Sequence, residues 1–575
     1  MEQHLQSLKS LLNQRWSLRP LKPELNIVQN ILMNRGINDP QAVNDYLNPN
    51  YKKGLHNPFL MKDMDKAVQR IKQATEKQER VIIFGDYDVD GISGTAVLYN
   101  ALKLYGANVS YRLPHRVNDG YGLNIKFIEE FKEKGINLLI TVDCGISCKA
   151  QIDKAAEYGI DVIITDHHTI PVEIPTKAYA ILHPKQPDCH YPFKGLTGSG
   201  VAYKLACALI TEKFSGPERD RILYALLDLA SLGTVADIGP LLDENRIIVK
   251  YGLEAMQNTN WPGLNHLMES AGLDLTQKLD VSAIGFKIGP RINAAGRIDH
   301  PYYALQMLLH EGDDQKGKSL AAYLEKLNTE RQQMVFKALE EAEVKYAEKD
   351  PLQKIFVAWS PDWHVGILGL LASRMVEKHN LPSIILQEFD GHLVASFRSN
   401  QTLNAVDALN HTKEFLDHYG GHAQAAGFSL KKEHLAGFIE KISAYAADKL
   451  EHYDFEHELL IDAELTHTDI NDNFMRLLSQ MEPFGVGNQK PIFLIRNVQP
   501  QDLKIVGKDQ NHLHFMAKVG SNRFSTIGFK LGKFHQQLLE FNKIDIAIHL
   551  DKNTWNGRES IQFQIQDIKP AENLS

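Results

Sequence analysis

One stretch, residues 81–100 with the sequence VIIFGDYDVDGISGTAVLYN, constrains the fold of this chain more than any other. The apolar run Val81–Phe84 predicts a buried strand, and the spacing of small and apolar residues from Gly94 onward predicts a helix. Between these two elements stand three carboxylates, Asp86, Asp88 and Asp90. Alternate residues of an extended segment point the same way, so the three can face one side of the strand's end, where a divalent cation would offset their repulsion. An acidic loop that caps the next helix through Asp90 or Ser93 is the alternative.

Two further strands are predicted to end in the same way. Apolar runs at 138–142 and 162–165 alternate with helical segments at 125–133 and 149–158, which is the pattern of a parallel sheet with crossover helices. The residues that follow these two strands are Asp143, Asp166, His167 and His168. Ligands of open parallel sheets bind beyond the carboxyl ends of the strands, so these side chains should gather in one place. One Asp alone would be a helix N-cap and one His a core residue, but three such strand ends favour a metal site.

A fourth contributor is expected between residues 223 and 241. A helical run there is predicted to break at Gly233 and to leave Asp237 in the turn that follows, where an exposed ligand would stand. Asp228, earlier in the same helix, is assigned to a solvated face.

The residue types narrow the choice of metal. Several Asp oxygens with one or two imidazoles fit Mn²⁺ or Mg²⁺ better than zinc, and the histidine favours Mn²⁺. Five or more ligands, with an Asp able to bridge, indicate two ions that clamp the attacking and leaving oxygens of a phosphoester. The pattern therefore points to hydrolytic phosphoryl chemistry. A structural zinc at Cys144, Cys148, Cys189 and His190 is a less favoured alternative, because the cysteine spacing is not that of a zinc ribbon.

The segments GDYDVDG, VDCG, TDHH and GTVAD are similar to the four motifs of the DHH phosphoesterase superfamily. The later segments PHRVNDGYGL (114–123), GPRINAAGR (289–297) and HYGGHAQAAG (418–427) resemble the RecJ family of bacterial single-strand-specific 5′-to-3′ DNA exonucleases. The resemblance extends from about residue 26 onward, and a set of motifs this long is far more specific than any one of them.

The resemblance implies roles for individual residues. The metal ligands would be Asp88, Asp90, Asp143, His167 and Asp237, with Asp143 bridging, and Asp86 would coordinate or tune the site. His168 would face the substrate and stabilise charge on the phosphate, and Arg291 would lie near the scissile phosphate. Further substrate contacts are expected at Arg116, Asn293, Ser396, Arg398 and His422. Residues 280–300 are expected to form a Gly-rich turn in which Arg291, Asn293 and Arg297 could hold phosphates, since guanidinium groups bind phosphates bidentately.

The chain is predicted to be a multidomain α/β protein. A helical preamble (1–80) precedes a parallel-sheet DHH domain (81–310), a long connector helix (311–350) and a second α/β domain of the DHHA1 type (351–450). Short alternating strands in 451–575 predict a small OB-type barrel, a fold that often stacks single-stranded bases on aromatic side chains. Candidates for this contact are His514, Phe515, Phe524 and Trp555, of which His514 and Trp555 are favoured and Phe515 least, because aromatic residues in strands are more often core.

Composition adds modest limits. A length of 575 residues predicts three to four domains, and no apolar run approaches membrane-spanning length. The net charge of −8 argues weakly against nucleic acid, because a local basic groove is enough for phosphate contacts. Four cysteines in so long a chain indicate reduced thiols, and the N-terminal residues lack a secretory h-region, so a cytoplasmic location is expected.

The function expected from these features is metal-dependent degradation of single-stranded DNA from the 5′ end to mononucleotides, in recombination and repair. The resemblance implies a RecQ-type helicase and a single-strand-binding protein as partners, and no membrane association. Two alternatives stay open: a DHH phosphodiesterase for short oligonucleotides or cyclic dinucleotides, and a catalytically inactive DNA-binding scaffold.

Overall fold

The computed structural model describes residues 9–571 except 117, 121, 313, 390, 401, 452, 454–456 and 556–557, with backbone alone at 389, 554, 555, 558 and 559. The chain divides into two compact units. The larger unit comprises Tyr51–Tyr453 and Gly485–Gly487, and the smaller unit comprises Met1–Asn50, Asp454–Phe484 and Asn488–Ser575. The larger unit is therefore inserted, in sequence, within the smaller one.

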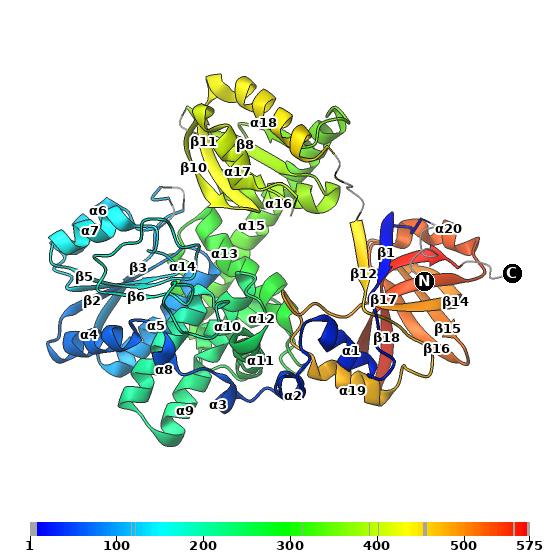
Figure 1. The fold of residues 1–575 in the computed structure, drawn as a ribbon, viewed down its shortest axis with the longest axis horizontal. Coiled ribbons are helices and arrows are strands. Elements are labelled where there is room, and N and C mark those ends of the chain that lie inside the picture. The colour runs from blue at the N-terminus through cyan, green and yellow to red at the C-terminus, as the bar shows by residue number, and fades with distance from the viewer. Residues whose placement is uncertain are drawn as a thin grey trace. The chain divides into compact units, whose positions relative to one another are not determined.

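The first part of the larger unit is built on a five-stranded sheet with the strand order β3-β2-β4-β5-β6. Every neighbouring pair in this sheet is parallel. The strands are β2 (Arg80–Gly85), β3 (Asn108–Arg112), β4 (Leu138–Val142), β5 (Asp161–Thr165) and β6 (Ala180–Leu182). Figure 1 shows them side by side with helices on both faces. The predicted parallel sheet is confirmed.

Strand β2 shows why this sheet is buried on both faces. Its side chains alternate, so Val81 and Ile83 join one apolar core while Ile82 and Phe84 join another. The first core contains residues of helices α4 (Met64–Glu76), α5 (Val89–Tyr105) and α8 (Gly198–Lys213). The second contains residues of helices α6 (Ile125–Glu133) and α7 (Lys149–Glu157).

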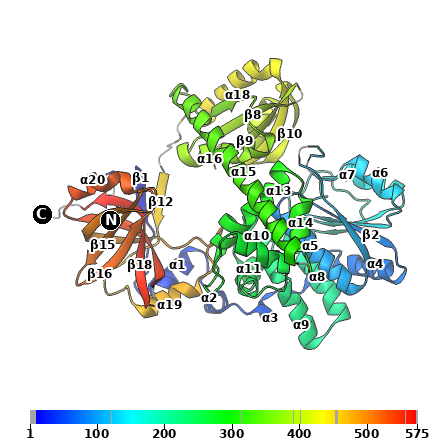
Figure 2. The same cartoon turned by 180° about the vertical axis from the view of Figure 1, so that it is seen from behind.

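A group of helices follows the sheet and ends in the long helix α15 (Asp314–Ala347), which confirms the predicted connector. In Figure 2, α15 runs from these helices toward the second sheet. The other members are α9 (Gly216–Ala225), α10 (Leu227–Ala236), α11 (Asp243–Met256), α12 (Pro262–Ser270), the π-helix Ala283–Ile288 (η3), α13 (Gly289–Ile298) and α14 (Tyr302–Leu308). The short helix α3 (Tyr51–Gly54) precedes the sheet in sequence and packs against α11.

Three local predictions in this region are wrong. Helix α10 runs through Gly233 and ends at Ala236, because Gly233 lies at a tight contact with α5 and α8 rather than at a turn. Residues 289–298 form helix α13 rather than a Gly-rich turn. Asp228 is buried rather than solvated, since it accepts hydrogen bonds from Trp261 Nε1 at 2.8 Å and Thr259 Oγ1 at 2.6 Å.

The second sheet of the larger unit is mixed, with the order β10-β11-β9-β8-β7. Only β7 and β8 pair in parallel. The strands are β7 (Phe356–Trp359), β8 (Ser383–Phe389), β9 (His392–Arg398), β10 (Leu416–His422) and β11 (Ala425–Lys431), and the helices are α16 (Leu368–His379), α17 (Ala405–His411) and α18 (Leu435–Lys449). The predicted second α/β domain is confirmed.

The smaller unit contains a closed barrel of five strands, in the order β14-β15-β16-β18-β17 with β14 also paired to β17. This confirms the predicted OB-type barrel. Its strands are β14 (Phe493–Val506), β15 (His512–Val519), β16 (Asn522–Gly528), β17 (Ile544–Trp555) and β18 (Arg558–Pro570), and β13 (Ala463–Glu464) extends β14. The helices of this unit are α1 (Ile27–Asn34), α2 (Pro40–Leu47), α19 (Asp472–Gln480) and α20 (His535–Leu539).

The segment expected as a helical preamble also contains a strand. Strand β1 (Gln14–Leu18) pairs in parallel with β12 (His457–Ile461). Trp16 of β1 is buried and donates from Nε1 to Asp567 Oδ2 at 2.9 Å. The N-terminal residues therefore belong to the smaller unit.

Two absences concern the described residues alone. None of their helices combines the length and the apolar character that crossing a bilayer requires. All four cysteines are free thiols, and none of them belongs to a group of described side chains placed to hold a metal. The zinc alternative therefore has no support in this part of the chain.

Candidate metal centre

The structure brings together all six residues predicted as metal ligands, and His168 with them. They come from four places: the turn from β2 into α5, the ends of β4 and β5, and the end of α10. Three groups of side chains have ligand atoms within 4.8 Å of one another: Asp86, Asp88 and Asp143; Asp90, His167 and Asp237; and Asp143, His167 and His168. Asp143 belongs to two of the groups, which is the arrangement expected of a bridging carboxylate.

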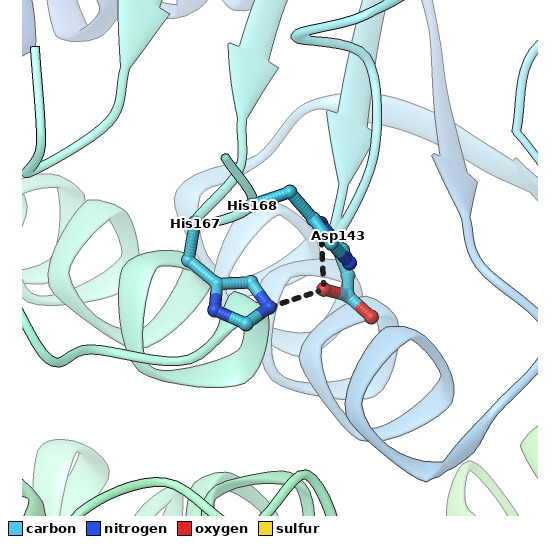
Figure 3. Close-up of side chains that lie close together, drawn as sticks. All are labelled: Asp143, His167 and His168. Atoms are coloured by element: carbon cyan, nitrogen blue, oxygen red, sulfur yellow. Dashed lines mark ion pairs between the residues drawn. The ribbon is translucent and has the colours of Figure 1, made fainter. Parts of the chain in front are cut away.

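His167 faces the carboxylates most directly. Its Nε2 atom lies 3.1 Å from Asp143 Oδ1, 3.4 Å from Asp237 Oδ2 and 3.8 Å from Asp90 Oδ2. The ring of His168 turns toward Asp143 from the same side, with Nδ1 at 3.8 Å from Oδ1, as Figure 3 shows. The two imidazoles thus converge on one carboxylate.

The donor set fits divalent cations. His167 Nε2 makes no hydrogen bond despite being buried among carboxylates, and Asp86 Oδ1 is likewise buried without a hydrogen-bond partner among the described residues. Buried polar atoms without partners are rare in proteins and are expected where an ion is held. Hard carboxylate oxygens with one imidazole nitrogen suit Mn²⁺ or Mg²⁺.

The electrostatics support the same conclusion. Burial, with the charges of Asp90 and Asp88, raises the pKa of Asp237 to about 8. Burial and neighbouring carboxylates raise the pKa of the other affected acids, Asp86, Asp88 and Asp143. Burial lowers the pKa of His167 to about 4, so its ring is neutral at pH 7, the state in which imidazole binds metals. Divalent cations would remove the repulsion that holds protons on these acids.

Backbone amides hold two of the acids in place. Asp90 accepts from Gly198 N at 2.6 Å and Ser199 N at 2.8 Å, at the N-terminus of α8, where the helix dipole favours negative charge. Asp88 accepts from Asp90 N at 3.0 Å and is the N-cap of α5. Capping and metal binding are therefore not exclusive, and the capping residue is Asp88 rather than Asp90 or Ser93.

Asp166 orients the histidine pair. It is buried and accepts from Ile146 N at 2.9 Å and His167 N at 2.7 Å, and its Oδ1 hydrogen-bonds His168 Nδ1 at 2.8 Å. Burial lowers the pKa of His168, but the hydrogen bond and the charge of Asp166 outweigh burial and raise this pKa to about 9. The ring of His168 is therefore held in one orientation beside Asp143.

Three arginines meet next to the carboxylates. Arg116 lies over the ring of Tyr87, 4.8 Å from its centre, and Arg297 donates to Gly366 O at 3.1 Å. Arg398 donates to Ser396 Oγ at 3.0 Å. Burial, with the positive charges of Arg116 and Arg331, lowers the pKa of Arg297 to about 9. Cations held this close together form a site for an anion such as a phosphate.

Alternation along β9 explains how Ser396 and Arg398 act together. Residues two apart on a strand face the same side, and the residue between them faces the other. Phe397 is accordingly buried with no exposed surface. Gly369 of the facing helix α16 leaves space for the guanidinium group of Arg398, because a Cβ at this position would lie 2.9 Å from Arg398 Nη2.

The remaining predicted substrate residues lie in several places. The ring of His422 stacks on the ring of His168, with 6.1 Å between their centroids, so His422 lies beside the metal centre. Arg291 is not drawn into the arginine cluster, since it pairs with Glu325 of α15 and donates to Lys287 O at 2.7 Å. Asn293 lines a cleft beside α15. His514 is in the barrel, 3.2 Å from Ser525 Oγ, and the side chain of Trp555 lies outside the described residues.

Two residues beside the metal centre were not predicted from the sequence, Tyr87 and Lys185. The ring of Tyr87 packs under the guanidinium group of Arg116. The position of Tyr87 between Asp86 and Asp88 in the sequence could have indicated that it belongs to the site. Lys185 donates from Nζ to His167 O at 2.5 Å, and no motif marked it. Phe515 and Phe524, the less favoured stacking candidates, are instead buried in the barrel core.

Three family models match the chain: the DHH family N-terminal domain over residues 80–234, the DHHA1 domain over 352–448 and the RecJ OB domain over 461–567. A single-stranded-DNA-specific exonuclease RecJ of Bacillus subtilis is 36% identical over 549 residues, which are 95% of this chain and 68% of that protein. The protein of the same name from Escherichia coli is 32% identical, with 95% and 96% covered. A crystal structure of Thermus thermophilus RecJ with Mn²⁺ matches with a TM-score of 0.82 at 29% identity, covering 97% of this chain and 80% of that one.

The sheet, the carboxylate–imidazole centre and the matched domains define a protein of the DHH class with a DHHA1 domain and an OB barrel. Within that class, the chain belongs to the RecJ family.

Stability without metal should fall as pH rises. The folded pKa of Asp237, about 8, exceeds its ordinary value of 3.8, so the folded chain binds more protons than the unfolded chain in this window and loses stability through it. The melting temperature in EDTA is therefore expected to fall between about pH 5 and pH 8. The melting temperature of Asp237→Asn should fall less over this pH range. Asp509→Asn, which changes an exposed residue and serves as the control, should show the same fall as the wild type. A fall of wild-type size in Asp237→Asn would contradict the assignment.

Gly233→Ala should disturb the centre. A Cβ there would lie 2.3 Å from Asp90 Oδ1 and 2.4 Å from Ser199 Oγ, so Asp90 must move. We expect a loss of about 1–3 kcal/mol of stability, typical of overpacking, and a weaker rise in melting temperature on adding Mn²⁺. Gly285→Ala is the control, because its Cβ would meet nothing nearer than 4.0 Å. Equal Mn²⁺ responses in the two variants would count against the packing argument.

Proposed function

We propose that this chain is a metal-dependent exonuclease that hydrolyses single-stranded DNA from the 5′ end. The observation that carries the proposal is the convergence of the carboxylates and His167 within coordinating reach, directly beside three arginines. The relatives named single-stranded-DNA-specific exonuclease support the choice of substrate.

Two Mn²⁺ or Mg²⁺ ions held at this centre would polarise a phosphate oxygen and supply a nucleophilic water at neutral pH. The holding residues are Asp86, Asp88, Asp90, Asp143, His167 and Asp237. Thermus thermophilus RecJ has been crystallised in complex with Mn²⁺ and, in a second structure, with Mg²⁺, which supports this choice of ions.

The chain's own side chains position the substrate. Arg116, Arg297 and Arg398, with Ser396, bind the terminal 5′ phosphate, because guanidinium forks match phosphate oxygens. Arg116 is close enough to Asp86 and Asp88 for its charge to act on both. The first phosphodiester therefore reaches the carboxylates when the terminal phosphate is bound, and one nucleotide is released per cut. His168, oriented by Asp166, binds an oxygen of the scissile phosphate.

The barrel of the smaller unit holds the incoming strand. His514 and Trp555 are proposed to stack on bases, which every base allows and which needs no sequence preference. Arg291 and Asn293 are secondary candidates for substrate contact, and the ion pair of Arg291 with Glu325 would have to open first. His422 closes the centre over His168.

A phosphodiesterase for short oligonucleotides is the second candidate function. The arginine cluster, Arg116, Arg297 and Arg398, could bind the phosphate of a short substrate equally well. The OB barrel favours a long substrate. An inactive scaffold is disfavoured, because every predicted ligand is present at the centre.

A cytoplasmic enzyme acting in recombination and repair fits four free thiols. An enzyme limited to single strands needs another protein to separate duplex DNA. A RecQ-type helicase and a single-strand-binding protein are the proposed partners.

A digestion experiment tests the function. With Mn²⁺, the protein should degrade single strands and 5′-tailed duplexes to mononucleotides, but should leave 3′-tailed and blunt duplexes largely intact. Asp143→Asn should lower kcat by about a thousandfold or more, because the carboxylate shared by two groups is lost. Degradation from the 3′ end, or wild-type turnover in Asp143→Asn, would refute the proposal.

Arg398→Gln should weaken capture of the 5′ phosphate. We expect KM for 5′-phosphorylated single strands to rise about tenfold, the effect of losing one charge-assisted hydrogen bond, and KM for 5′-hydroxyl strands to change little. Arg476→Gln, at an exposed arginine of α19, is the control. Equal effects on both substrates would place the phosphate elsewhere.

A further inference from the structure

The main chain of the histidine pair stands just beyond the first sheet. The pairing of β5 with β6 ends at Thr165 and Leu182, so His167 and His168 follow the last paired residues of β5. We call the segment that follows β6, residues 183–189 with the sequence HPKQPDC, the β6 loop. Two of its side chains bond to the carbonyl oxygens of the histidine pair, and the function proposed above assigns nothing to this loop.

His183 of the β6 loop binds the second histidine of the pair. Its ring is fully buried, Lys185 N donates to its Nδ1 at 3.1 Å, and its Nε2 lies 2.8 Å from His168 O. Because a backbone N–H can only donate, Nδ1 is the acceptor and the ring proton is on Nε2. The contact with His168 O is therefore a hydrogen bond donated by His183, and the ring is held in one tautomer.

Lys185 of the β6 loop binds the first histidine of the pair. Its Nζ donates to His167 O at 2.5 Å, although the side chain is otherwise exposed. A charged donor makes a stronger hydrogen bond than a neutral amide does. The ammonium is close enough to Asp237 and to His422 for its charge to act on both, so it lies beside the metal centre.

The β6 loop is itself held in one conformation by side chains. Lys194 donates from Nζ to Pro184 O and to Cys189 O, each at 2.7 Å. Gln186 is buried and donates from Nε2 to Ile181 O at 2.7 Å. The two donors that face the histidine pair are therefore in place before an ion binds, which is what a precisely positioned ligand requires.

The main chain of each histidine is thus bound at both of its polar groups. Asp166 Oδ1 accepts from His167 N at 2.7 Å and from His168 N at 3.1 Å. The carbonyls of the same two residues are bound by Lys185 and His183. Since a residue has only two soft backbone dihedrals, fixing its amide and its carbonyl also fixes the direction in which its side chain leaves the backbone.

We propose that His183 and Lys185 are positioning residues of the metal centre, which hold both imidazoles toward Asp143 by binding the carbonyls of the histidine pair. This inference rests on the proposed nuclease function and assigns the β6 loop a part in it. Residues that orient metal ligands commonly change metal affinity or activity by about tenfold to a hundredfold. The charge of Lys185 alone would act in the opposite direction, because a cation beside a cation site weakens metal binding.

Lys185→Met separates the two effects by their sign. In calorimetric titration of the metal-free protein with MnCl₂, the Kd for Mn²⁺ should rise about tenfold or more, because the His167 carbonyl loses its donor. Lys185→Arg, which restores a charged donor, should recover most of the affinity. At saturating Mn²⁺, kcat of Lys185→Met on single-stranded oligothymidine should fall while KM stays within about twofold, since the arginine cluster is unchanged.

Lys62→Met is the matched control for the lysine. Lys62 Nζ bonds to Asp188 of the same β6 loop at 2.7 Å, but this pair is exposed and does not touch the histidines. Exposed ion pairs contribute little to stability, so the Kd for Mn²⁺ and kcat should both match the wild type.

His183→Phe and His183→Gln test the second contact. Both substitutions alter a buried ring and should lower the melting temperature. Glutamine keeps an N–H donor that reaches the His168 carbonyl, whereas phenylalanine keeps the ring and loses the donor. His183→Gln should therefore bind Mn²⁺ about tenfold more tightly than His183→Phe.

Tighter Mn²⁺ binding in Lys185→Met would overturn the proposal, because Lys185 would then act by its charge alone. Wild-type Kd and kcat in Lys185→Met would overturn it as well, and this variant of an exposed side chain decides the question even if His183→Phe does not fold. A wild-type protein that binds Mn²⁺ but degrades no single strand would instead refute the nuclease function, while the Kd values would still report on positioning.

Discussion

Crowding of negative charge at the carboxyl ends of the first sheet is the constraint on which the larger unit depends. Four acids in the cluster have raised pKa values, and burial is the first cause for each. Backbone dipoles offset part of the free energy that burying these charges requires. The first amides of α8 donate to Asp90, and Asp166, which accepts from His167 N, holds the histidine pair. A scaffold that tolerates the acids without fully neutralising them is one that gains from binding cations.

Two residues with left-handed backbone conformations lie where this centre is assembled. Asp143 has φ 62° at the end of β4, and Ile238 follows the last carboxylate with φ 59°. Asp tolerates the left-handed region better than most residues, whereas isoleucine does not. One residue thus directs a carboxylate between two histidines, and the other directs an apolar side chain into the cleft beside α15.

Much of the fold and the centre was predictable from the sequence, because the carboxyl ends of the strands in a parallel sheet meet at one edge, where ligands bind. Buried runs followed by Asp or His located the cluster without coordinates, and the long helix α15 followed from an uninterrupted helical pattern. Contacts between distant segments were not predictable. Gly233 indicates a turn locally, yet it is needed where α10 touches Asp90, and Asp228 is buried because Trp261 reaches it from another loop. The short strand β1 needs a partner more than four hundred residues away, which no local pattern encodes.

The pairing of β1 with β12 also determines when the smaller unit can form during synthesis. The hydrogen bond from Trp16 to Asp567 joins residues 551 positions apart. At translation rates of about 5–20 residues per second, the N-terminal strand must wait roughly half a minute to two minutes for its partners to leave the ribosome. The larger unit can fold first, since its residues are complete earlier, while Trp16 and its neighbours stay exposed to chaperones until the last barrel strand emerges.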